Sequence, residues 1–445
     1  MLVVAILASF VSFLDGTVVN VALPAIADEL GGPGAGGLAL QQWVVDAYLV
    51  TLGALILVAG SFSDVHGRRR VLLVGLAGFA AASVLCALAP TGPVLVVARA
   101  LQGVAGALLV PSSLALIISA YSGPAQGRAI GRWTAWTGTA MIVGPLVGGL
   151  FVDTLSWRWV FWINLPVVAL TLWLVRGVPE SSGDARRRID VRGAVLVALG
   201  LAATVYALIE GGRLGWGATA VWGPLAAGVV LLGVFFAWER RAQDPVLPLR
   251  LCSSRNFAWG NLATAAVYGA LGLGGFVVTL FLQQVAGYTA MWAGLAQLPT
   301  TFAMLALSTR FGTLAGRYGP RAFMTVGPVL AGAGYLLLLT TDATAWYPTQ
   351  VLPGLLLFGL GLAVTVAPLT SAILGAVPAD DAGIASAVNN AVARVAGLVV
   401  VAFAGVILGG VLDVGSFHRA LVVTGGLLVL GGLISWAGIR NPRPA

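Results

Sequence analysis

The sequence contains no lysine and few charged residues of any kind. Charged residues make up 9% of the 445 positions, and the 24 basic residues behind the net charge of +8 are all arginines. Soluble domains carry charge at about a quarter of their positions. The P-loop that cradles the phosphates of ATP requires a lysine. The composition therefore argues against an ATP-driven pump of that type, and we expect the energy source to be an ion gradient.

Histidine and cysteine are also scarce, with two of each. Cys86 and Cys252 do not have the spacing of a metal site or of a disulfide framework. His66 and His418 lie outside the apolar runs, and the chain has no HExxH or GxSxG motif. We therefore expect no metal, no cofactor and no enzymatic activity.

Apolar residues dominate what is present, at 59% of the chain. Runs of about twenty residues, long enough to cross a hydrocarbon core roughly 30 Å thick, follow one another along the sequence. The first run holds Asp15 and ends at Pro24, which predicts a retained span rather than a cleaved signal peptide. The predicted fold class is an all-α integral membrane protein with fourteen transmembrane helices. The predicted spans are 2–23, 41–62, 71–89, 93–119, 130–151, 157–175, 191–209, 220–238, 257–280, 292–311, 322–339, 347–373, 385–408 and 420–439.

The arginines test this count, because cytoplasmic loops of membrane proteins are enriched in basic residues. Alternate loops differ sharply, and only Arg158, Arg213 and Arg419 fall on the poor side, while Arg99 and Arg394 lie within spans. The rich side holds Arg68, Arg69, Arg70, Arg128, Arg132, Arg176, Arg186, Arg187, Arg188, Arg192, Arg240, Arg241, Arg250, Arg255, Arg310, Arg317, Arg321, Arg440 and Arg443. Both termini are thus predicted to be cytoplasmic. Arginines confined to short loops do not indicate nucleic-acid binding.

An internal repeat predicts the organisation of the spans. The loop that follows the second span aligns with the loop that follows the tenth at five positions. They are Gly60, Phe62, Ser63, Gly67 and Arg69 in the first loop and Gly312, Leu314, Ala315, Gly319 and Arg321 in the second. The offset of eight spans indicates two related six-helix bundles separated by two extra spans. We predict an N-terminal bundle over 1–178, spans 7 and 8 with their loops over 179–255, and a C-terminal bundle over 256–445.

Charged residues inside the spans require a reason, since each costs roughly 2.5–3.5 kcal/mol at the bilayer centre. Counting about 1.5 Å per residue places Asp15, Asp46 and Arg99 roughly 4, 8 and 10 Å from their span midpoints, toward the outer side. They could form a polar cluster facing a cavity, or a static buried ion pair. We predict proton coupling at Asp15, with substrate binding or a structural role as alternatives, and Arg99 as its partner. Asp46 fits coupling or a structural role, and Arg394 fits structure better than chemistry.

Small residues accompany these charges. In the fourth span, Arg99 and Gln102 are followed by Gly103 and Gly106 at a spacing that permits close helix approach, and Pro111 is expected to interrupt the helix. The fifth span contains a GxxxG pair and a proline, for which simple packing is an equal explanation. These residues are Gly144, Pro145, Gly148 and Gly149.

Several motifs together resemble the major facilitator superfamily, specifically its fourteen-span drug:proton antiporter branch, over essentially the whole chain. They are FLDGTVVNVALPAIADEL at 13–30, QQWVVDAYLV at 41–50, GSFSDVHGRRR at 60–70, ARALQGVAGALLVPS at 98–112 and GPLVGG at 144–149. The resemblance matches the first-span signature at Asp15, Asn20 and Pro24.

The resemblance also implies roles for the later motifs. It implies a cytoplasmic gating loop made by Gly60, Asp64, Gly67, Arg68 and Arg69, in which Val65 replaces the usual arginine. It implies proton coupling for the motif of the fourth span. In the fifth span it implies an antiporter motif, which favours export over import.

The resemblance implies two six-helix bundles around a cavity that opens alternately to either side. We assign to a candidate substrate cavity Asn20, Gln102, Trp133, Trp136, Phe276 and Arg394. The expected partners are a small amphiphilic substrate, protons and the lipid bilayer of the cell membrane, with the monomer as the functional unit. A dedicated exporter of one natural product or lipid is the nearest alternative, and a transport-inactive sensor is a more distant one.

Overall fold

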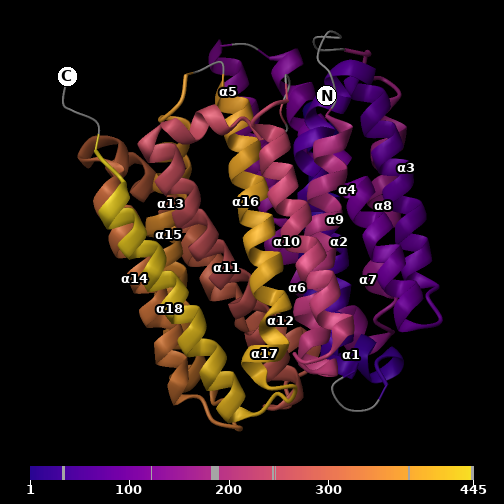
Figure 1. The fold of residues 1–445 in the computed structure, drawn as a ribbon, viewed down its shortest axis with the longest axis vertical. Helices are drawn as coiled ribbons and strands as arrows, with labels where there is room; N and C mark the ends of the chain where they lie inside the picture. The colour runs from indigo at the N-terminus through magenta and orange to yellow at the C-terminus, as the bar shows by residue number, and fades with distance from the viewer. Residues whose placement is uncertain are drawn as a thin grey trace. The chain divides into compact units, whose positions relative to one another are not determined.

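The computed structural model describes residues 1–32, 36–121, 123–181, 190–242, 245, 247–378 and 381–441. Throughout this part of the chain the regular elements are helices (Figure 1). Thirteen helical segments are long and apolar enough to cross a membrane, and a shorter apolar segment covers Trp159–Val175. Each of the fourteen predicted spans overlaps one of these segments, so the predicted fold class is confirmed. The predicted cytoplasmic arginines at 186, 187, 188 and 443 lie outside the described residues.

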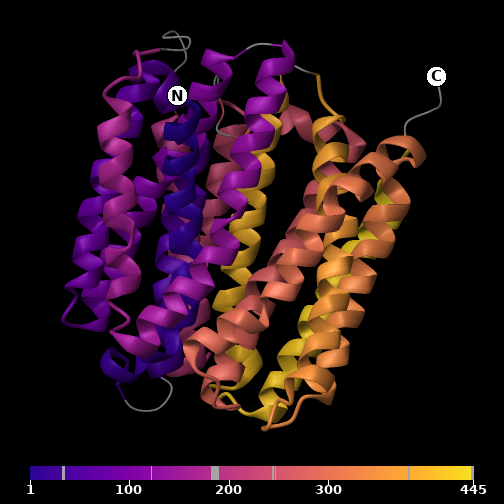
Figure 2. The ribbon, with the colours of Figure 1, turned by 180° about the vertical axis from the view of Figure 1, so that it is seen from behind.

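The chain divides into two compact units, which are described separately: Met1–Leu247 with Thr289–Met291, and Pro248–Tyr288 with Trp292–Ala445. The first unit contains α1 (Leu2–Leu30), α2 (Gly36–His66), α3 (Arg68–Ala87), α4 (Gly92–Ala120), α5 (Gly123–Gly138), α6 (Ala140–Thr154), α7 (Trp159–Trp162), α8 (Asn164–Val175), α9 (Val191–Leu214) and α10 (Thr219–Glu239). These helices, indigo to magenta, run alongside one another in Figure 1 and from behind in Figure 2.

The second unit begins with the short 3₁₀ helix η1 (Leu249–Ser253). It continues with α11 (Arg255–Gln284), α12 (Ala290–Ala296), α13 (Leu298–Tyr318), α14 (Pro320–Leu337), η2 (Leu338–Thr340), the short π-helix η3 (Tyr347–Val351), α15 (Leu352–Leu374), α16 (Ala382–Ala402), α17 (Ala404–Leu408) and α18 (Val414–Gly438). Asp413 and Ser416 form a reciprocal capping box at the start of α18, which satisfies two backbone N–H groups of the first turn.

The proline of α4 does not interrupt its helix. α4 continues through Pro111 to Ala120, contrary to the interruption expected there, because a proline removes one backbone hydrogen bond while the neighbouring turns keep theirs. Four predicted spans are instead divided at other positions, with α5 and α6 meeting near Thr139 and α7 and α8 near Ile163. The other two divisions lie between α12 and α13 and between α16 and α17.

Glycines set the closest helix contacts of the first unit. A Cβ at Gly103 of α4 would collide with the backbone carbonyl of Tyr48 and the hydroxyl of Thr51 on α2. The Thr51 hydroxyl donates instead to the Ala100 carbonyl at 2.8 Å. The spacing predicted from the sequence therefore brings α2 and α4 into direct backbone contact.

α9 packs against α2 within the first unit. Glu210 of α9 is 7% exposed and accepts a hydrogen bond from Trp43 Nε1 of α2 at 3.1 Å. Arg213, one turn further along α9, donates to the same carboxylate at 2.7 Å. The two extra spans, α9 and α10, thus group with the N-terminal helices by contact.

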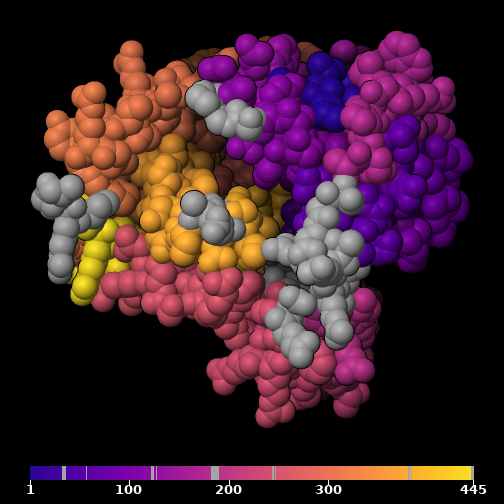
Figure 3. Space-filling view, turned by 90° about the horizontal axis from the view of Figure 1, so that it is seen from above, coloured from indigo at the N-terminus to yellow at the C-terminus, as the bar shows by residue number. Residues whose placement is uncertain are grey.

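The internal repeat has the same local structure in both units. Gly67 and Gly319 precede α3 and α14 with φ of 95° and 87°, a left-handed conformation that glycine adopts without a steric penalty. Arg69 Nε donates to the Val175 carbonyl at the end of α8, and Arg321 Nε donates to the Trp436 carbonyl near the end of α18. Figure 3 shows the face of the molecule at which α1 begins, where atoms of the first unit are packed closely together.

Candidate functional site

Asp15 and Arg99 form an ion pair in the interior of the first unit. Arg99 Nη1 of α4 donates to Asp15 Oδ2 of α1 at 2.6 Å, and the side chains are 2% and 0% exposed. The structure therefore brings together two of the three charges predicted to cluster. Both are enclosed by protein rather than open to a cavity.

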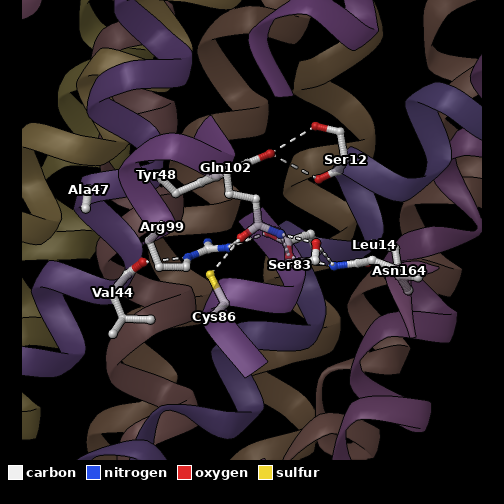
Figure 4. A network of polar contacts seen from close by, with 12 residues as sticks. Ser12, Leu14, Val44, Ala47, Tyr48, Ser83, Cys86, Arg99, Gln102 and Asn164 are labelled. Carbon is white, nitrogen blue, oxygen red and sulfur yellow. Dashed lines mark hydrogen bonds and ion pairs between the residues drawn. The ribbon is translucent and has the colours of Figure 1, made fainter. Parts of the chain in front are cut away.

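Gln102, Ser83 and Asn164, from three helices, lie close together (Figure 4), and the two amides among them bind the carboxylate of Asp15. Its Oδ1 accepts from Gln102 Nε2 at 2.8 Å and from Asn164 Nδ2 at 3.1 Å. Both amides also donate to Ser83 Oγ of α3, at 3.0 and 3.3 Å. With Arg99, three donors surround the carboxylate, and hydrogen bonds of this kind favour its charged form.

The Arg99 guanidinium has further partners of its own. Nη1 also donates to Gln102 Oε1 at 2.6 Å, and Nε donates to the Val44 carbonyl of α2 at 3.0 Å. The ring of Tyr48 lies 4.5 Å from the guanidinium carbon, a cation–π contact that is strengthened by burial. α1, α2 and α4 are thus joined through one side chain.

Asp46 of α2 is the third predicted charge, and its surroundings differ. The residue is 0% exposed. Neither of its carboxylate oxygens has a hydrogen-bond partner among the residues that the structure describes. An ionised carboxylate in such a place is strongly disfavoured. The two acids of this bundle therefore occupy opposite environments, one with three donors and one with none.

Two contacts of the antiporter motif lie between α6 and α1. A Cβ at Gly144 would collide with the hydroxyl of Thr17, and one at Gly148 with the side chain of Val18. Thr17 Oγ1 donates to the Ala140 carbonyl at 3.1 Å. The GxxxG pair thus holds α6 against α1, the helix that carries Asp15, while Pro145 and Gly149 complete the same segment.

The predicted gating loop is a network of helix caps. Asp64 and Arg68 form an i,i+4 ion pair at 2.9 Å, and Gly60 lies on α2 about two turns before Gly67, where a Cβ would meet nothing within 4 Å. Arg69 Nε and Nη2 donate to the carbonyls of Val175 and Arg176, so a cation meets the negative end of α8.

The other predicted cavity residues are dispersed. Trp133 of α5 donates from Nε1 to Ser9 Oγ at 3.0 Å, whereas Trp136 is 61% exposed and Phe276 is 3% exposed. Asn20 is half-buried, with its amide donating to the Gly16 carbonyl at 3.3 Å. Arg394 lies in the second unit and is partly exposed.

Three residues of these networks were not predicted from the sequence. Ser83 and Asn164 contact the Asp15 carboxylate region from α3 and α8. Glu180 accepts from the backbone N–H groups of Arg69 and Arg70 at 3.0 and 3.2 Å, which caps α3. Each is a single polar residue without periodic pattern in the sequence.

Among the described residues, no three histidine, cysteine, aspartate or glutamate side chains lie together in a group that could hold a metal ion.

Comparison with known proteins identifies relatives over most of the chain. The chain is 38% identical over 388 residues to the Multidrug resistance protein Stp of Mycobacterium tuberculosis, covering 86% of this chain and 70% of that protein. It is 37% identical over 413 residues to the Puromycin resistance protein pur8 of Streptomyces alboniger (90% and 80%). It is 33% identical over 436 residues to the Methylenomycin A resistance protein of Streptomyces coelicolor (97% and 90%).

Solved transporters share the fold. A crystal structure of the D-xylose-proton symporter superposes with a TM-score of 0.72 at 16% identity, covering 99% of this chain and 97% of that one. The peptide transporter POT in complex with sulfate gives 0.69 at 16% identity, covering 98% and 94%. The model of the Major Facilitator Superfamily matches residues 5–401. The chain, with its many apolar helical spans, is therefore a membrane transporter that belongs to the Major Facilitator Superfamily.

Proposed function

We propose that this transporter exports small amphiphilic compounds, antibiotics among them, in exchange for protons. Export is supported by relatives whose names describe resistance, including the Tetracenomycin C resistance and export protein of Streptomyces glaucescens, 34% identical over 397 residues. The energy would come from the proton gradient. Proton exchange requires a group whose protonation changes the contacts between helices, and the first unit contains two acids suited to that role.

The observation that carries the proposal is the contrast between Asp15 and Asp46. The Asp15 carboxylate receives three donors, Arg99 among them, whereas neither oxygen of Asp46 has a hydrogen-bond partner among the described residues. Arg99 does not lose its proton in proteins. Protonation of Asp15 therefore removes the attraction that joins α1 to α4, and entry of water to Asp46 permits its proton to leave.

The proposal also covers the arrangement of the spans in the membrane. We propose that 1–178 and 256–445 form the two transporting bundles, that α9 and α10 within 179–255 are an addition to the first, and that the monomer is the functional unit. Both termini would lie in the cytoplasm, as the arginine distribution predicts. The Asp64–Arg68 loop would then lie at the cytoplasmic gate.

A dedicated exporter of one natural product is the second candidate. It is favoured by relatives named for single compounds, such as the Probable actinorhodin transporter of Streptomyces coelicolor, 34% identical over 421 residues. Both candidates predict the same proton site. They differ in breadth, which a panel of substrates measures directly.

The test is efflux of a panel of lipophilic compounds and antibiotics from cells that express the wild type, Asp15→Asn or Asp46→Asn, with and without collapse of the proton gradient. We expect efflux to stop on collapse and in both variants. Glu29→Gln is the matched control, because Glu29 also lies on α1 but is 48% exposed and pairs with Arg158 outside the cluster. Efflux that survives collapse of the gradient contradicts proton exchange.

A further inference from the structure

Charge is distributed differently among the helices of the two units. In the first unit, the two acids deep within spans, Asp15 and Asp46, are both 0% exposed. In the second unit, no helix from α11 to α18 contains an aspartate or a glutamate. The charged side chains of its spans are all arginines. A substrate that enters the exposed parts of these helices therefore encounters positive charge.

Arg394 is the arginine nearest the middle of a span. It lies eleven residues after Gly383 and fourteen before Leu408, the limits of the apolar segment, or roughly 17 and 21 Å along the helix. Long basic side chains reach the interface only from near helix ends. Arg310, by comparison, is eight residues from the end of α13 at Tyr318, or about 12 Å. Arg394 thus remains at membrane depth.

Arg394 belongs to a polar face of α16. Ser386, Asn390 and Arg394 recur at i, i+4 and i+8, which places them on one side of the helix. Asn390 is exposed and the other two are partly exposed. Near the start of α16, the neighbouring Asn389 packs against α11, where it donates to Asn261 Oδ1 at 3.2 Å and to Thr264 Oγ1 at 2.8 Å.

A polar face of this kind is expected to meet water rather than lipid. Ionisable residues within spans face a bundle interior or an aqueous cavity, because contact with hydrocarbon is costly. Near its start the helix also has a packed apolar side, made by Ala385 and Val388, which are at most 3% exposed. The polar face is therefore the side available to a molecule crossing the membrane.

We propose that Arg394 and Asn390 bind the anionic group of the substrate, so that the exported compounds are amphiphilic weak acids rather than lipophilic cations. The guanidinium of arginine binds carboxylates and similar anions through paired hydrogen bonds. The Asn390 amide, one turn away, supplies a further donor. A cationic drug would instead be repelled by Arg394, while both acids that attract it are enclosed.

Equilibrium binding to purified protein in nanodiscs tests the inference with two dyes on one xanthene scaffold, anionic fluorescein and cationic rhodamine 123. We expect wild type to bind fluorescein more tightly. Arg394→Gln should weaken that binding about tenfold, the loss typical of one hydrogen bond to a charged group. Arg394→Lys should retain part of it, and Asn390→Ala should lose severalfold. Arg310→Gln is the matched control and should bind as wild type.

Two results overturn the inference: a wild type that does not bind fluorescein more tightly than rhodamine 123, and a folded Arg394→Gln that binds fluorescein as the wild type does. Thermal unfolding of each variant checks folding, and Asn390→Ala provides a second variant that retains the charge. The inference rests on the proposed function but fails separately from it. If binding depends on Arg394 but proteoliposomes show no proton-driven flux, proton exchange is refuted and the acidic substrate is not. If proton-driven flux of rhodamine 123 is the same with and without Arg394, the acidic substrate is refuted and proton exchange is not.

Discussion

Arg99 Nη1 lies 2.6 Å from Asp15 Oδ2 in a site that excludes water, so the two charges depend on one another. Removal of one member leaves the other buried without its counter-ion, which typically destabilises a protein by about 3–5 kcal/mol. Because the guanidinium cannot discharge, the two members are not equivalent. An unpaired carboxylate can take up a proton, whereas an unpaired arginine retains its charge.

Asp15→Asn should therefore lower the free energy of unfolding by about 3–5 kcal/mol, and Arg99→Gln should lower it by less at acidic pH than at neutral pH. The double variant should lose less than the sum of the two. Reversible unfolding in mixed micelles measures the cycle. The Arg158–Glu29 pair, with side chains 30% and 48% exposed, is the control, since exposed pairs contribute up to about 1 kcal/mol. Strictly additive losses would show that the buried charges do not interact.

Asp46→Asn should leave the free energy of unfolding nearly unchanged, because asparagine resembles the protonated acid that the unpartnered site favours. Infrared difference spectroscopy offers a direct measurement. The wild type should show the carbonyl stretch of a protonated carboxyl that is missing in the variant. A spectrum in which no such band disappears would mean that Asp46 is ionised.

Gly103→Ala should destabilise the first unit by about 1–3 kcal/mol, the usual range for overpacking. Its Cβ would meet the Tyr48 backbone, which cannot rotate away. Gly131→Ala is the matched control, because a Cβ there meets nothing within 4 Å and alanine favours the helix by up to about 1 kcal/mol. The two substitutions should thus shift the unfolding midpoint in opposite directions, and a shared direction would disprove the close contact of α2 with α4.

Asp413 makes the start of α18 sensitive to acid. Hydrogen bonds from the backbone and side chain of Ser416 hold the pKa of the Asp413 carboxyl below its ordinary value of 3.8. A lowered folded-state pKa means that the stabilisation is complete above the ordinary value and is lost as the pH falls through the lowered one. The Ser416 amide, which donates to Asp413 Oδ1 at 2.6 Å, should then exchange faster relative to an unfolded reference.

Hydrogen exchange in two variants separates the charge from the cap. Asp413→Asn keeps a capping oxygen without a titrating group, so its protection at Ser416 should not change with pH over that range. Asp413→Ala should lose protection at every pH. Acid sensitivity that persists in Asp413→Asn would assign the effect to another group.

Much of the fold was predictable because it depends on local quantities. Apolar runs of membrane length specify spans, and the loops rich in arginine specify alternate connections, so all fourteen segments could be placed. Repeated glycine and arginine positions predicted the related turns at Gly67 and Gly319, which the structure confirms. The breaks near Thr139 and Ile163 were not predicted, since packing against neighbouring helices decides where a span divides.

The candidate site was predictable in its charged members and in Gln102. Asp15 and Arg99 could be identified as candidates because a charged residue within a span has a high energetic cost, and its position within an apolar run can be read from the sequence. No comparable sequence signal identifies Ser83, Asn164 or Glu180. An isolated polar residue contributes to a site only where the fold provides a hydrogen-bond partner for it. The roles assigned to the antiporter motif and to the cavity residues stay predictions.

The sequence by itself determined that the chain is a membrane protein, how many spans it has and which charged residues lie within them. It could do so because hydrophobic length and charge are properties of single segments. Only the tertiary structure decided that Asp15 receives three donors while Asp46 receives none among the described residues. The protonation of a buried acid depends on the atoms that other helices bring to it, and these helices come from distant parts of the chain.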